Sequence, residues 1–179
     1  MTIMTGTAIT TNAGRTILNQ TGNVIQCVQY NYPSLYTNSS TRNTEYDMPG
    51  VLGDGTATIT PSYSSNRILI MHQISLGNEL TWRSTGFRTY YKIGAGSWVN
   101  YTGGFAGITY ANTTGCCITI HQNYLLSSLN TTSTVAFKLT FVEHNDGGNM
   151  RLNDNNNTGS LGSNLANTSS SITIWEIAA

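Results

Sequence analysis

The residues best suited to acid–base or metal chemistry are three histidines, His72, His121 and His144. His72 and His121 lie inside apolar, strand-like segments, where a histidine most often completes its hydrogen bonds within the fold. His144 follows Glu143 at the end of another such segment, and adjacent residues of a strand point to opposite faces. The pair is not placed for proton transfer, so the histidines predict neither a catalytic nor a metal site.

A second candidate is the segment DNNNTG at residues 154–159, whose oxygen-bearing side chains are those of a calcium-binding loop. The helix–loop–helix calcium site needs a glutamate at the twelfth loop position, where this chain has Leu165, and the flanks are not helical. An asparagine-rich turn is the better interpretation. Since no nucleophile elbow, zinc-protease motif or carboxylate pair occurs either, we expect no enzymatic activity, no cofactor and no metal.

The third candidate is a stretch in which basic and aromatic side chains are interleaved. Arg83, Arg88 and Lys92 lie among the aromatic residues of segment 81–93. Such a pattern suits single-stranded nucleic acid or carbohydrate. The alternative is a strand with one solvated face, which is favoured because three cations in a chain of zero formal net charge make no electrostatic funnel. Candidate glycan contacts, if a ligand binds, are Trp82, Tyr90, Tyr91, Trp98 and Tyr101.

Composition narrows the class of protein that must hold these residues. Only 9% of the 179 residues are charged, against about a quarter in an average domain. The 39% of hydrophobic residues and the zero net charge argue against disorder and predict one domain with a substantial core. Threonine, serine, asparagine and glycine fill the polar positions, as in all-β proteins with many turns. No basic cluster indicates nucleic acid, and no stretch is long enough to span a membrane.

The three cysteines, Cys27, Cys116 and Cys117, match no zinc-site spacing. Cys116 and Cys117 would point to opposite faces of a strand and are poorly placed to bridge each other. We expect three free, small, buried hydrophobic residues, as in a protein assembled in a reducing cytoplasm. The N-terminal segment also lacks the charged start and continuous apolar stretch of a signal peptide.

The chain is organised around residues 56–77, TATITPSYSSNRILIMHQISLG. Alternation around Ala57 and Ile59 predicts a strand that ends at Pro61, and a polar turn follows. Residues 67–76 form the longest apolar run, which favours a buried central strand, with a helix as the weaker alternative. We expect these two strands to form a central pair around which the others are laid.

Further strands are expected at residues 22–30, 81–93, 115–122, 135–143 and 171–177, with weaker ones near 45–48 and 150–152. Gly86 would mark a bulge or a break in the strand at residues 81–93. Residues 98–110 are expected to form a hairpin around Gly103-Gly104. About eight strands, turn signals between them and no convincing helix predict an all-β fold. The architecture is an antiparallel β-sandwich, jelly-roll-like, over residues 22–179.

Residues 1–21 form a separate N-terminal segment in this scheme. Its sizeable apolar side chains are spaced without a helical or strand period; they are Ile3, Met4, Ile9, Ile17 and Leu18. One interpretation is a frayed terminus, and the other is an extended arm that becomes ordered against a neighbouring subunit.

Three pieces of the chain resemble small β-sandwich virion proteins of tailed, especially aquatic, bacteriophages. GNVIQCVQY at residues 22–30 is similar to a recurrent GKVLQVVQ opening. TATITPSYSSNRILIMHQISLG is similar to VSITPSSTSSKILI, and SSSITIWEIAA at the C-terminus is similar to STLTLMEIAA. The pieces occur in the same order, and the resemblance covers residues 22–179 but not the N-terminal segment.

This resemblance implies a virion structural protein assembled in the cytoplasm of a host bacterium. The first expectation is a decoration or cement protein on the outer surface of the capsid, trimeric, with the major capsid protein as its partner. The alternative is a tail-fibre or spike module that binds host surface glycans, and a non-viral lectin-like module is a third. Candidate capsid or subunit contacts are the five apolar residues of the arm together with Trp175.

Trp175 belongs to a terminal strand with apolar residues on both faces. Ile172, Ile174 and Glu176 share one face, and Thr173, Trp175 and Ile177 share the other. Such a strand is expected to be buried against the core on one side and against a neighbouring subunit on the other.

Overall fold

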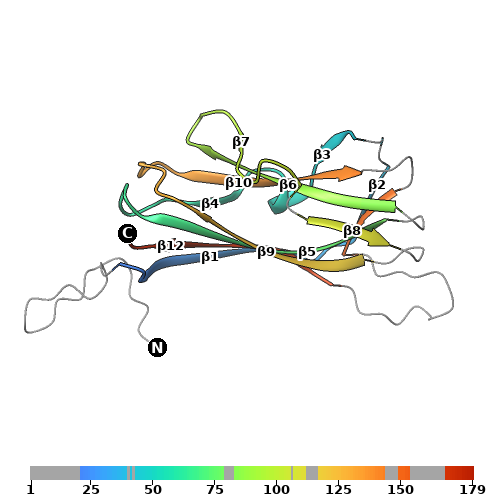
Figure 1. The fold of residues 1–179 in the computed structure, drawn as a ribbon, viewed down its shortest axis with the longest axis horizontal. Coiled ribbons are helices and arrows are strands. Elements are labelled where there is room, and N and C mark those ends of the chain that lie inside the picture. The colour runs from blue at the N-terminus through green and yellow to red at the C-terminus, as the bar shows by residue number, and fades with distance from the viewer. Residues whose placement is uncertain are drawn as a thin grey trace, which may run out of the picture.

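The computed structural model describes residues 21–39, 41, 43–78, 83–105, 107–111, 117–143, 149–153 and 168–179. It is an antiparallel β-sandwich, two sheets packed face to face (Figure 1). The elements, in chain order, are β1 (Val24–Tyr32), β2 (Tyr36–Ser39), β3 (Glu45–Asp47), the 3-10 turn η1 (Gly50–Leu52), β4 (Ala57–Ile59), β5 (Arg67–Asn78), β6 (Arg83–Ile93), β7 (Val99–Asn100), β8 (Gly107–Ala111), β9 (Cys117–Leu126), β10 (Val135–Glu143), β11 (Asn149–Leu152) and β12 (Ser170–Ile177). None of the described residues form a helix long and apolar enough to cross a membrane.

The strand order is that of a jelly roll, which confirms the predicted fold class. In the first sheet, β1 pairs with β12, β12 with β5, and β5 with β9, while β11 and β2 extend the sheet beyond the end of β12. In the second sheet, β3 and β4 pair with β10, β10 with β6, and β6 with β7 and β8. From β5 to β12, successive long strands therefore alternate between the sheets, and apolar residues at every second position meet in one core.

β5 is the central strand that the apolar run at residues 67–76 predicts. The prediction that it pairs with the preceding strand, β4, is wrong. β4 pairs with β10 in the second sheet, while β5 lies in the first between β12 and β9. The polar turn after Pro61 thus crosses from one sheet to the other. Local alternation identifies a strand but not the sheet that it joins, because that depends on partners distant in sequence.

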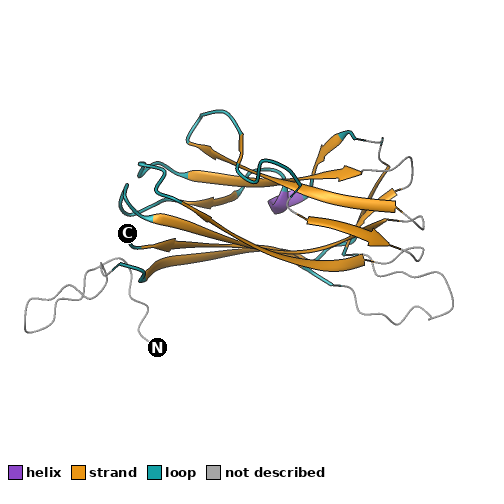
Figure 2. Ribbon diagram, viewed as in Figure 1, coloured by secondary structure: helices purple, strands orange, loops and turns teal. Residues whose placement is uncertain are grey.

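The core lies between the two sheets, and η1 lies between them as well (Figure 2). Ile70 and Ile74 of β5, Phe137 and Phe141 of β10, and Leu52 of η1 are almost fully buried. Large apolar side chains from opposite sheets therefore interdigitate along the whole molecule, which is the main source of its stability.

β12 is not a frayed edge, because it lies between β1 and β5 in the first sheet. Ile172 and Ile174 point into the core and have no exposed surface. The other predicted face, with Trp175 and Ile177, lies on the outside of the sheet and is only partly buried in the single chain. The prediction of burial against the core is confirmed, and burial against a neighbour stays a prediction.

Three local expectations need correction. β6 pairs continuously with β10 through Gly86, so there is no bulge or break. β7 and β8 each pair with β6 rather than with each other, so residues 98–110 do not form a hairpin. β2 is not among the strands that the sequence predicts; its polar sequence YTNS is held by pairing with β11.

Candidate functional site

The two outer faces of the sandwich differ in chemistry. The outer face of the second sheet carries charged side chains from three strands: Glu45, Asp47, Arg88, Lys92 and Lys138. The outer face of the first sheet carries mostly apolar and uncharged polar side chains along β1, β12, β5 and β9, with Arg67 at one end of β5 and His121 on β9. In a chain with so few charges, this separation makes the two faces the candidate functional surfaces.

The charged face contains a pocket of about 340 Å³, here called the Glu45 pocket. It lies where β3, β6 and β10 run side by side and where the chain enters β7. Its lining residues are Glu45, Asp47, Tyr90, Trp98, Lys138 and Thr140. Trp98 packs against Gly55, whose φ of +80° and missing side chain allow the indole this close; a Cβ there would lie 3.0 Å from the ring.

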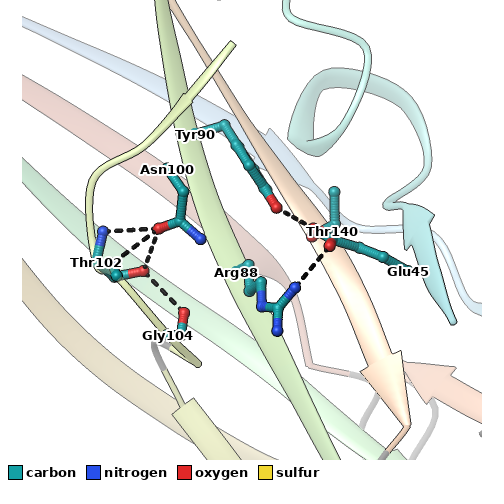
Figure 3. A network of polar contacts seen from close by, with 8 residues as sticks. Glu45, Arg88, Tyr90, Asn100, Thr102, Gly104 and Thr140 are labelled. Atoms are coloured by element: carbon teal, nitrogen blue, oxygen red, sulfur yellow. Dashed lines mark hydrogen bonds and ion pairs between the residues drawn. The ribbon is translucent and has the colours of Figure 1, made fainter. Parts of the chain in front are cut away.

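Glu45 is held in place by donors from two neighbouring strands (Figure 3). Tyr90 and Thr140 donate their hydroxyl hydrogens to Oε1, and Arg88 donates to Oε2 at 2.9 Å. Burial raises the pKa of Glu45, but these hydrogen bonds and the charge of Arg88 outweigh it and hold the pKa below its ordinary value. Burial and the bond to Glu45 raise the pKa of Tyr90. The site therefore holds a fixed carboxylate and a neutral phenol.

Lys138 contacts three other residues that line the pocket. Its Nζ donates to Asp47 Oδ1 at 2.6 Å and lies 5.2 Å from the ring centroid of Trp98 and 5.7 Å from that of Tyr90. Lys92 Nζ lies 4.8 Å from the Trp98 centroid. These distances are those of cation–π contacts, which fix the orientation of the two rings.

The segment after β7 is ordered by an asparagine turn, also drawn in Figure 3. Asn100 Oδ1 accepts hydrogen bonds from the backbone nitrogens of Thr102 and Gly103, at 3.0 and 2.9 Å. This turn directs Tyr101 between the sheets, where it is 8% exposed. There its ring packs near Tyr124, with centroids 5.1 Å apart.

The predicted glycan contacts are thus separated by the fold. Tyr90 and Trp98 line the Glu45 pocket. Tyr101 is buried in the core, so its expected role as a surface contact is wrong, while Tyr91 is partly buried and packs against the core. Trp82 lies outside the described residues.

Four of the residues that line the pocket are not predicted from the sequence: Glu45, Asp47, Lys138 and Thr140. They come from two strands almost a hundred positions apart, and only the pairing of β3 with β10 brings them together. The alternation of side chains along β10 places Lys138 and Thr140 on the face opposite its core residues. This alternation is the one feature of the sequence that indicates their place on the outer surface.

The apolar outer face of the first sheet is here called the docking face. Its centre is a row of residues in register across four strands: Cys27, Trp175, Leu69 and Leu125. Ile177 and Met71 lie in the rows on either side. Leu125 is 49% exposed. Uncharged polar residues continue the face, including Gln29, Gln73 and Asn123, which line a shallow hollow of about 110 Å³ beside Met71.

Cys27 is a free thiol exposed on this face, so the expectation that it is buried is wrong. Desolvation nevertheless raises the pKa of Cys27, with a smaller opposite effect of the Trp175 indole beside it. Cys117 is buried as expected and its thiol donates to the carbonyl oxygen of Arg151 at 3.7 Å. Cys116 lies outside the described residues.

The other candidate subunit contacts, Ile3, Met4, Ile9, Ile17 and Leu18, also lie outside the described residues, as do His144 and the segment at residues 154–159. Of the two histidines that are described, His72 makes hydrogen bonds within the fold, as expected. His72 is buried in the core, and His121 is exposed on the docking face.

No known protein family matches the chain. No curated protein matches it in sequence. Solved structures with a similar fold include infectious bursal disease virus, Gt strain, at 15% identity and a TM-score of 0.46, over 88% of this chain and 39% of that one. The Gx strain matches at 14% identity and a TM-score of 0.42, over 86% of this chain and 37% of that one. A VP2 subviral particle of the same virus matches at 13% identity and a TM-score of 0.33, over 82% of this chain and 38% of that one.

The chain thus spans less than two fifths of the length of each of these structures. The fold defines the chain as an antiparallel jelly-roll domain with one charged and one largely uncharged outer face.

Proposed function

We propose that this chain is a non-enzymatic structural protein of a bacteriophage virion, bound to the outer surface of the capsid, where it stabilises the particle. The observation that carries the proposal is the docking face. Exposed apolar patches bordered by uncharged polar residues mark protein–protein interfaces. The sequence resemblance to virion proteins of tailed phages supplies the kind of particle.

The chemistry of the docking face suits a permanent protein contact. Its apolar residues lie on paired strands, so they are already ordered and their association costs little conformational entropy. Trp175 is central to the row, and tryptophan is among the residues that contribute most to interfaces. The charged groups Arg67 and Arg151 lie towards the two ends of the face, opposite Ile177 and Gly77, and leave its centre neutral.

Two further features support self-association, which we propose to be trimeric. Among the described strands, β1 pairs only with β12 and β9 pairs only with β5, so both edges of the first sheet are available for pairing. The chain also enters the domain beside this sheet: Gly22 N donates to Ala178 O at 2.9 Å. A 20-residue arm that starts here has a reach of up to about 70 Å when extended. The partners proposed are therefore the major capsid protein and other copies of this chain.

The location is tested by labelling purified virions with antibodies raised against the folded domain, viewed by electron microscopy. Label over the heads, at a stoichiometry of many copies per particle, is the expected result. Label confined to the tail would replace the capsid assignment with the fibre alternative. Absence of the protein from purified virions would overturn the virion proposal.

The surface is tested by adding charge to each outer side of the sandwich. Leu125→Lys places an ammonium group on the docking face, and we expect the variant to co-sediment at least tenfold less with capsids that lack the protein. Val99→Lys is the matched control, because Val99 is 46% exposed on β7 of the other sheet. Both sites are exposed, so both variants should melt like the parent. Equal loss of binding in the two variants, or none in either, would contradict the proposal.

A further inference from the structure

We propose that the Glu45 pocket binds an uncharged saccharide. This site lies on the sheet opposite the docking face, so it stays accessible when that face is covered. The proposal does not depend on the virion assignment, because it follows from the shape, charges and hydrogen-bonding groups of the pocket alone.

The charges of the pocket exclude most other ligand classes. Each carboxylate at the pocket has a cation as its partner, Arg88 for Glu45 and Lys138 for Asp47, and Lys92 is a third cation, beside Trp98. An anion such as phosphate would lie against the Asp47 carboxylate, and a metal cation would lie against the Lys138 ammonium group. A ligand with many hydroxyl groups and no net charge meets neither repulsion.

The polar groups can both donate and accept. Asp47 accepts from Lys138 at Oδ1, and its side chain is 58% exposed, which leaves acceptor positions open towards solvent. The ammonium group of Lys138 carries three hydrogens, of which this ion pair uses one. A vicinal pair of sugar hydroxyls can donate to Asp47 and accept from Lys138 at the same time.

Aromatic rings supply the apolar part of such a site. Tyr90 and Trp98 both line the pocket, with the ammonium group of Lys138 between them. The carbon–hydrogen face of a sugar ring packs against aromatic rings, while the long lysine side chain can turn towards Asp47 without losing that ion pair. The volume of about 340 Å³ lies in the range of small-ligand pockets and suits one sugar unit, with further units extending over its open side.

The site is also held rigid before any ligand arrives. Glu45 accepts from Tyr90, Thr140 and Arg88, which fixes the Tyr90 phenol beneath the pocket. Trp98 is held between Lys92, Lys138 and the backbone at Gly55. Ordered side chains lose little conformational entropy on binding, which favours recognition of a weakly interacting ligand such as a sugar.

The test is titration of the intact protein with glucose, galactose, mannose and N-acetylglucosamine, followed by screening on an array of larger neutral glycans. Tryptophan fluorescence and the indole proton–nitrogen correlations of NMR report the binding. We expect millimolar affinity for at least one free sugar, with the Trp98 indole signal shifting and that of Trp175 unchanged.

Asp47→Ala should weaken the binding about tenfold, as loss of hydrogen bonds to an exposed carboxylate implies, without changing the melting temperature. Trp98→Ser should abolish it and Trp98→Phe should keep part of it, since phenylalanine retains a stacking ring. Asn123→Ala on the docking face is the control and should bind like the parent.

Three outcomes would overturn the proposal. One is that no sugar or neutral glycan binds. Another is that sugars bind equally to the parent, Asp47→Ala and Trp98→Ser. The last is that inorganic phosphate or calcium shifts the Trp98 signal at lower concentration than any sugar does, which would assign the pocket to an ion.

Discussion

The hydroxyl of Tyr101 donates a hydrogen bond to Nε2 of His72, 3.0 Å away, in the core between the two sheets. The other ring nitrogen, Nδ1, lies 3.3 Å from the carbonyl oxygen of Gln122. A carbonyl oxygen can only accept, so Nδ1 carries the hydrogen and Nε2 is left to accept from tyrosine. A loop of the second sheet is thereby tied to the central strand of the first through a neutral histidine.

Stability is expected to fall as the pH is lowered from about 6.5 to 4. Burial lowers the pKa of His72 to about 4, and the hydrogen bond to Gln122 offsets only part of this effect. The unfolded chain therefore binds a proton more readily than the folded chain in this window, which costs up to about 3 kcal/mol by pH 4. Urea unfolding at pH 7 and pH 4.5 measures the loss.

His72→Gln should flatten this pH dependence, while His121→Gln, on the exposed face of β9, should leave it as in the parent. Equal slopes for the parent and His72→Gln would show that another group controls acid stability.

Removing the Tyr101 hydroxyl should destabilise the domain. Tyr101→Phe leaves Nε2 of His72 buried without a donor, at a cost of about 1–3 kcal/mol. Thermal unfolding should show a lower melting temperature for this variant. Tyr63→Phe is the matched control, because Tyr63 is 49% exposed. A parent-like melting temperature for Tyr101→Phe would mean that the hydrogen bond contributes nothing.

Glu176 should be among the least replaceable polar residues. Its carboxylate has no exposed surface and accepts from Asn66 Nδ2, Gln26 Nε2 and the Ser62 backbone nitrogen, each at 2.6 Å. Glu176→Ala leaves these donors unsatisfied where the turn after Pro61 crosses between sheets, and should cost about 3 kcal/mol or more. Asp54→Ala, at an exposed carboxylate, should cost much less. Chemical denaturation distinguishes the two.

Trp175→Ala should affect assembly more than folding. Trp175 lies on the docking face rather than in the core, so its removal leaves no cavity between the sheets. We expect a folded variant that fails to form the oligomer or to bind the particle, as measured by light scattering and co-sedimentation. Ile174→Ala, one position away and fully buried, should instead lose about 2–5 kcal/mol of stability. A normal oligomer from Trp175→Ala would remove the tryptophan from the interface.

Deletion of residues 1–18 should leave a soluble β domain that no longer joins the particle. The described contacts of the domain begin at Thr21, whose hydroxyl donates to Ala179 O at 2.8 Å, so the deletion spares them. Circular dichroism and melting temperature check the fold, and co-sedimentation with capsids checks the arm. Truncated protein that binds capsids normally would show that the arm is only a tail.

The sequence by itself determined what local physics controls. Alternating apolar residues along β1, β5, β10 and β12 predict those strands because every second side chain must reach the same core. The scarcity of charge and the abundance of turn residues predict an all-β sandwich. The two-sided apolar pattern of β12 predicts burial of both faces; the core face is buried as predicted, and burial of the outer face against a neighbour stays a prediction.

Tertiary structure decided everything that depends on partners distant in the chain. Alternation cannot tell that β4 joins β10 while β5 joins β12, because both strands would bury the same residues in either sheet. It cannot separate the buried Tyr101 from the surface Tyr90, because a turn at Asn100 redirects the chain. Glu45 and Lys138 share a pocket only through strand pairing across almost a hundred residues, and pairing of that range has no local signature.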